Sequence, residues 1–341
     1  MRLPRVLLRP GLLLLPLVLA ASALPASAQQ DGAFTLRAWG KDDRLNLNLV
    51  YEDGHSNYGR MVERSALSDV VRTGDRITFA IRREAGTFTF DGRGTLERAS
   101  GWYGFAPNQS FRTEMEKLGY RDIEPKHLFV FAMDDLTVAK VKHLQQLVSN
   151  KLDTAELVQL INHGAGFTYV QAMTSLGFKN LTSGDYRRAR DHGVSESYVR
   201  EMADLGMKLP LDDLVRLRDH GVNPEYVRGM RTAGFDVSSD ELVRARDHGV
   251  NVEFLQRMRD FGFTGLALAD YIRMRDHGVT TEFVQAFRDL GYTTLTPNEL
   301  VRLKDHGVSA SYARRIKDLM KESPSVEQLV RMRSGGDFGS R

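Results

Sequence analysis

Residues 213–227 read Asp-Leu-Val-Arg-Leu-Arg-Asp-His-Gly-Val-Asn-Pro-Glu-Tyr-Val, and versions of this stretch recur along most of the chain. The string Asp-His-Gly-Val occurs five times, starting at Asp191, Asp219, Asp247, Asp276 and Asp305. A variant, Asn-His-Gly-Ala at 162–165, precedes them, and successive copies lie 28 or 29 residues apart. A fixed period of this length is typical of one supersecondary unit stacked on itself, so the sequence predicts a solenoid.

Each repeat carries the signals of two short helices joined by a tight turn. Thr296 with Glu299 forms a capping-box pattern ahead of the first helix. That helix is expected to end at the glycine of the Asp-His-Gly string, because glycine readily adopts the left-handed conformation at a helix end. Asn223 ahead of Pro224 then caps the second helix. The glycines at this structural position are Gly164, Gly193, Gly221, Gly249, Gly278 and Gly307.

Helices of this length are marginal alone in water, so the units must stack into a continuous core. Residues 107–333 are predicted to form an α-solenoid of about seven helical hairpins, with a truncated last helix. Residues 334–341 look like a disordered tail.

Residues 31–106 have a different pattern, in which apolar residues alternate with polar ones between glycines. Leu45, Leu47 and Leu49 illustrate the period of two. We expect five or six antiparallel strands in a small sheet or partly closed barrel, with one helical turn at 65–71 and with Trp39 and Trp102 in the core. The fold class is therefore α+β.

Residues 1–28 have the features of a secretory signal peptide, with three arginines, a short apolar stretch and Ala-Ser-Ala at 26–28. Of the 47 basic and 44 acidic residues, these three arginines account for the whole net charge of +3. A neutral mature chain gives no electrostatic reason to expect nucleic acid. We expect a periplasmic or secreted bacterial monomer with no membrane span after cleavage. An uncleaved anchor remains the alternative.

The histidines and arginines of the repeat are the candidate binding residues: His192, His220, His248, His277, His306, Arg190, Arg218, Arg246 and Arg275. The favoured interpretation is structural, with each histidine donating to free carbonyls at the end of its helix. Each arginine is expected to pair with an aspartate of an adjacent unit. The alternatives are metal binding or proton sensing by the histidines, and an arginine-lined groove for an acidic peptide.

Catalytic motifs are missing from the sequence. It has no cysteine, no phosphate-binding loop and no zinc-peptidase motif. An enzyme would need a pocket that brings His55 or His127 together with acidic residues. We therefore predict neither catalysis nor a cofactor nor a resident metal.

The repeat at 213–227, and the segment 86–108 that leads into the array, resemble helical repeats found C-terminal to BlaR1-type membrane sensor peptidases of bacteria. The resemblance covers roughly residues 75–333. It implies a role in envelope sensing or protein interaction. It transfers no catalytic residue, because the zinc motif and the membrane helices of those peptidases are missing here. The sequence thus favours an exported interaction scaffold for a protein or peptide, and the alternative is a small-ligand or metal sensor.

Overall fold

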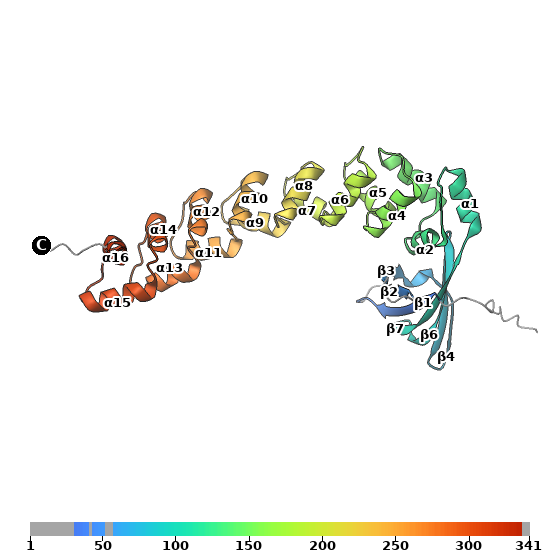
Figure 1. Ribbon diagram of the computed structural model, residues 1–341, viewed down its shortest axis with the longest axis horizontal. Helices are drawn as coiled ribbons and strands as arrows, with labels where there is room; N and C mark the ends of the chain where they lie inside the picture. The colour runs from blue at the N-terminus through green and yellow to red at the C-terminus, as the bar shows by residue number, and fades with distance from the viewer. Residues whose placement is uncertain (1–30, 41–42, 52–56, 336–341) are drawn as a thin grey trace, which may run out of the picture. The chain divides into compact units, whose positions relative to one another are not determined.

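The computed structural model describes residues 31–40, 43–51 and 57–335. The predicted signal peptide, His55 and residues 336–341 of the predicted tail lie outside the described residues. The chain divides into two compact units (Figure 1). One contains the described residues up to Met115 together with Glu124–Thr137, and the other contains Glu116–Ile123 and the chain from Val138 onward. An antiparallel sheet followed by regular helices confirms the predicted α+β class.

The first unit is built on one antiparallel sheet in the order β3-β2-β1-β7-β6-β5-β4. The strands are β1 (Gly32–Ala38), β2 (Arg44–Tyr51), β3 (Asn57–Glu63), β4 (Leu67–Thr73), β5 (Arg76–Arg83), β6 (Gly86–Thr95) and β7 (Arg98–Pro107). Strands β3 and β4 lie at opposite ends of this order, yet only Arg64–Ala66 connects them. Three residues span about 10 Å at most. The sheet must therefore curl into a partly closed barrel.

Alternation along the strands gives the sheet one buried, aromatic face. Phe34 lies 5.1 Å from Phe90, which stacks on Phe79 at 4.4 Å between ring centroids. Helix α2 (Pro125–Met133) contacts β6 and β7, and its Phe129 ring lies 5.2 Å from that of Phe88. This helix therefore completes the core of the sheet.

Three expectations for this unit need correction. The described residues contain seven strands instead of five or six, and the expected turn at 65–71 is a short 3-10 helix at Arg64–Ala66 followed by β4. The placement of the tryptophans in the core was wrong, since Trp39 is 56% exposed and Trp102 is 51% exposed. Neighbouring residues on a strand point to opposite faces, and Tyr103 takes the core position beside Trp102.

The helices follow one another with short connections. They are α1 (Gln109–Lys117), α2 (Pro125–Met133), α3 (Val138–Leu147), α4 (Thr154–Asn162), α5 (Phe167–Ser175), α6 (Ser183–Asp191), α7 (Glu196–Asp204), α8 (Leu211–Asp219), α9 (Pro224–Thr232), α10 (Ser239–Asp247), α11 (Val252–Asp260), α12 (Leu268–Asp276), α13 (Thr281–Arg288), α14 (Pro297–Asp305), α15 (Ala310–Met320) and α16 (Val326–Arg333). None of the helices in the described ranges is long and apolar enough to cross a membrane.

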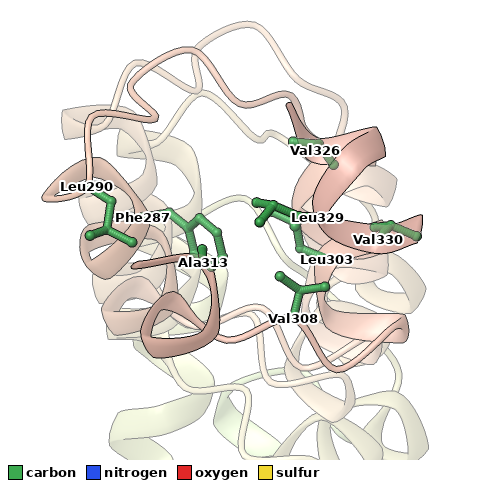
Figure 2. Packing of buried hydrophobic residues seen from close by; sticks show 8 residues of the cluster. All are labelled: Phe287, Leu290, Leu303, Val308, Ala313, Val326, Leu329 and Val330. Atoms are coloured by element: carbon green, nitrogen blue, oxygen red, sulfur yellow. The ribbon is translucent and has the colours of Figure 1, made fainter. Parts of the chain in front are cut away.

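Helices α4–α15 form six consecutive hairpins, and α16 adds half a unit (Figure 1). The even-numbered and odd-numbered helices make two rows: α4, α6, α8 and α10 contact in succession, as do α5, α7, α9, α11, α13 and α15. Figure 2 shows the core between the last units, where Phe287, Leu303, Ala313 and Leu329 are fully buried. Each hairpin thus buries its apolar faces against its neighbours, as short helices require.

The helix starts confirm the capping signals. Ser238 and Glu241 form a complete capping box on α10, as Asp153 with Glu156 does on α4 and Thr296 with Glu299 on α14. The second helices are capped by side chains that accept from a backbone N–H in the first turn: Ser195, Asn223, Asn251, Thr280 and Ser309. These local signals fix where the capped helices begin.

Candidate functional site

The glycines of the Asp-His-Gly string end the first helix of each hairpin as predicted. All six have left-handed φ values, between 64° and 74°. At Gly221 the backbone N–H donates to Arg218 O at 3.0 Å, and the next N–H, of Val222, donates to Leu217 O at 2.8 Å. The turn therefore satisfies the last carbonyls of the helix with backbone donors.

The histidines of the string do not bind their own helix ends. Their Nδ1 atoms lie 2.5–2.7 Å from an aspartate Oδ1 of the next unit. We call these pairs the histidine–aspartate row: His163–Asp191, His192–Asp219, His220–Asp247, His248–Asp276 and His277–Asp305. The sixth histidine, His306, meets Ser334 at 3.3 Å. The expected pairing of these aspartates with Arg190, Arg218, Arg246 and Arg275 is therefore wrong.

The basic residue before each aspartate, and Arg333 before Ser334, lies over an aromatic ring of the preceding unit. These contacts form the basic–aromatic row: Arg190–Tyr169, Arg218–Tyr198, Arg246–Tyr226, Arg275–Phe254, Lys304–Phe283 and Arg333–Tyr312. The charged group lies 4.6–5.5 Å from the ring centroid, within cation–π range. One such contact is present at every interface from α4–α5 to α16.

Tyrosines of this row also bond to the next unit's backbone. The hydroxyls of Tyr169, Tyr198 and Tyr226 donate to the carbonyls of Val194, Val222 and Val250 at 2.8–3.2 Å. Burial raises the pKa of each of these tyrosines to about 12, which the nearby arginine partly offsets. The phenols therefore remain neutral and act as donors.

The cap glycines also make room for the basic residue of the next unit. A Cβ added at Gly193 would lie 3.0 Å from Arg218 Nη2, and one added at Gly249 would lie 3.2 Å from Arg275 Nη2. Arg275 Nε also donates to Gly249 O at 3.0 Å. Glycine is thus favoured here both by its backbone conformation and by the approach of the neighbouring side chain.

A second set of arginines makes ion pairs that the sequence analysis missed. Arg216 pairs with Asp240 at 2.6 Å, and Arg302 pairs with Glu327 at 2.6 Å. Arg188 pairs in the same way with Asp212. These pairs join the fourth-last residue of one first helix to the first turn of the next. These ion pairs are exposed, so each one alone contributes little to the stability of the array.

The repeat ends carried a signal for the histidine–aspartate row. The first hairpin keeps His163 but has Asn162 where later units have aspartate, and the last half unit has Ser334 at that position. Asn162 fits a histidine bonded to the following unit's aspartate, because the first hairpin's aspartate position has no preceding histidine of the repeat. Ser334 instead takes the place of the aspartate beside His306.

A groove of about 510 Å³ lies between the α4–α5 and α6–α7 hairpins. Its lining comes from both hairpins: Gly164, Thr168, Tyr169, Arg190, Ser195, Glu196, Ser197 and Arg200. The lining combines charged and hydroxyl side chains with apolar surface, and it includes one member of the basic–aromatic row, Arg190.

The other candidate histidines form no such site. His127 Nδ1 accepts from Glu124 N at 3.2 Å as part of the cap of α2, and His143 lies against the Phe167 ring at 5.5 Å. Within the described ranges, no three His, Asp or Glu side chains gather closely enough to hold a metal ion.

Comparison with family models, curated proteins and solved structures finds no match to this chain.

Proposed function

We propose that this protein is an exported, non-catalytic scaffold that binds a protein or peptide through the surface of its helical repeats. The groove between the α4–α5 and α6–α7 hairpins carries the proposal, because it is open and lined by charged and hydroxyl side chains from two units. A stacked array offers such surfaces at fixed spacing, which suits an extended partner. Export follows from the signal-peptide features of residues 1–28.

The absence of catalysis is part of the proposal. The histidines from His163 to His277 each have one aspartate partner in the next unit. A general acid or base needs to reach a substrate atom, and a nucleophile needs an adjacent base. Residues already engaged in joining units are better explained as structural. The resemblance to repeats of sensor peptidases adds envelope sensing as the proposed setting.

The test is affinity capture from an envelope extract with the purified protein as immobilised bait. An unrelated exported protein serves as the control bait, and free purified protein serves as the competitor. The proposal expects a partner that the competitor displaces and that protects array residues from limited proteolysis. Capture with protection confined to the sheet would contradict the proposal, as would binding of small molecules alone.

A further inference from the structure

We propose that the groove around Arg190 is a carboxylate-binding subsite that takes an acidic side chain of a bound peptide. The inference rests on the proposed function, since it names the chemistry of the partner at one place on the array.

Arg190 is held in place without using its hydrogen-bond donors. Its guanidinium lies 5.5 Å from the centroid of the Tyr169 ring, and its Nε lies 3.4 Å from the position of a Cβ on Gly164. Throughout the described part of the chain, no carboxylate lies within ion-pair distance of this guanidinium. A stacked guanidinium keeps its planar N–H donors at the edge, where they match the two oxygens of a carboxylate.

The remaining charges in the groove cancel each other. Arg200 Nη2 lies 2.5 Å from Glu196 Oε1 in an ion pair within α7. The Ser195 hydroxyl accepts from Tyr198 N at 3.1 Å and lies 2.9 Å from the Ser197 hydroxyl. The net positive charge of the groove is therefore that of Arg190. An anionic partner group is complementary to it.

The unit that contains Arg190 differs from the next three units at one repeat position. The second residue of the second helix is Ser197 here, whereas the next three units have glutamate at that position: Glu225, Glu253 and Glu282. The pKa of Glu282 is lowered by a backbone hydrogen bond, by the Thr280 and Thr281 hydroxyls and by the charge of Arg275. At Glu282 the chain thus supplies its own carboxylate near Arg275. The groove at Arg190 has Ser197 at that position, so a carboxylate there would come from another molecule.

One other unit has a serine at this position, Ser311, but its basic residue is Lys304. An ammonium lacks the planar fork that binds a carboxylate through two parallel hydrogen bonds. Among the units with described hairpins, the combination of arginine and serine therefore distinguishes the groove at Arg190.

The test selects peptides from a random 12-residue display library on the purified full-length protein and measures the affinity of labelled synthetic binders. Two variants alter the subsite: Arg190→Gln removes the positive charge of the guanidinium, and Ser197→Glu introduces the carboxylate that neighbouring units have at this position. Glutamate in a first helical turn favours the helix, so the second variant keeps the fold. Arg246→Gln is the matched control, because it alters the same repeat position beside Glu253. Urea unfolding checks that each variant is folded.

We expect selected peptides to share an acidic residue, and its replacement by the amide to weaken binding at least tenfold. Arg190→Gln and Ser197→Glu should each weaken binding at least tenfold, and Arg246→Gln should change it less than twofold. Peptides that bind equally well to both subsite variants would overturn the inference while leaving the scaffold function intact. A selection that yields no array-binding peptide would contradict both.

Discussion

Replacing Gly193 with alanine should destabilise the array through two separable effects. The first is backbone strain, because Gly193 has φ of +74° and a residue with a Cβ costs about 1–2 kcal/mol in that conformation. The second is displacement of Arg218, since the new Cβ would lie 3.0 Å from its Nη2. Arg218 must shift by a few tenths of an ångström, and we expect the shift to disturb its contact with the Tyr198 ring, 5.0 Å away. Loss of such a contact costs about 0.5–1 kcal/mol. The expected total is about 2 kcal/mol.

Gly206→Ala is the matched control. Gly206 has φ of +75°, and a Cβ there meets no atom within 4 Å. This variant should lose only the stability that backbone strain costs, about 1–2 kcal/mol, and so should be about 0.5–1 kcal/mol less destabilised than Gly193→Ala. In an Arg218→Ala background, the difference between the two glycine variants should disappear.

Urea unfolding followed by far-ultraviolet circular dichroism gives the free energy of unfolding of every variant. The double-mutant cycle formed by Gly193→Ala and Arg218→Ala isolates the coupling between the two positions. Equal destabilisation by Gly193→Ala and Gly206→Ala would refute the reasoning. It would mean that the arginine moves without cost and that the basic–aromatic row does not hold adjacent units together.

Four further predictions follow from the contacts between units and from the sheet. Burial raises the pKa of Tyr198 from 10.0 to about 12, so the stability that the buried phenol contributes is complete below pH 10 and is lost as pH rises toward 12. At pH 11 the free energy of unfolding should have fallen by about 1.4 kcal/mol. Urea unfolding at each pH measures this loss, which Tyr198→Phe should remove. A double-mutant cycle on His220 and Asp247 should give a coupling in the free energy of unfolding of about 0.2–1 kcal/mol at neutral pH, because the pair is half-exposed. Zero coupling would show that contacts of the histidine–aspartate row do not stabilise the array. Zn²⁺ should leave the melting temperature unchanged, and an increase that His220→Ala abolishes would support the metal alternative. Trp102→Ala should lower the free energy of unfolding by less than about 1 kcal/mol, whereas Phe88→Ala should lower it by about 3–5 kcal/mol. Similar losses would contradict the placement of Trp102 on the exposed face of the sheet and Phe88 on the buried face.

The sequence predicted the hairpin array because its signals are local. A capping residue such as Ser238 acts within its own first turn, and Gly221 ends its helix through its own backbone conformation. The 28–29-residue period then requires identical units to stack. No knowledge of the packing geometry was needed for these steps.

Contacts between units could not be derived in the same way. Periodicity shows that the residue before each aspartate lies on the packed side of its helix, but the rotation between hairpins decides whether Arg218 meets an aspartate or the ring of Tyr198. The same rotation brings Asp219 to His192. In the sheet, Trp102 and Tyr103 are neighbours on one strand, so only one of them can face the core. Both are aromatic, and hydrophobicity alone did not show that Tyr103 is the buried one.

Site-specific photo-crosslinking in living cells tests the central claim most directly. A benzoylphenylalanine replaces Thr168, which is exposed and lines the Arg190 groove, and in a matched variant it replaces Trp102 on the exposed face of the sheet. Our account predicts that illumination joins a discrete partner to the Thr168 position, and that adding Ser197→Glu reduces this product. Adducts formed at the Trp102 position but not at Thr168 would contradict the claim that the repeat surface is the binding surface.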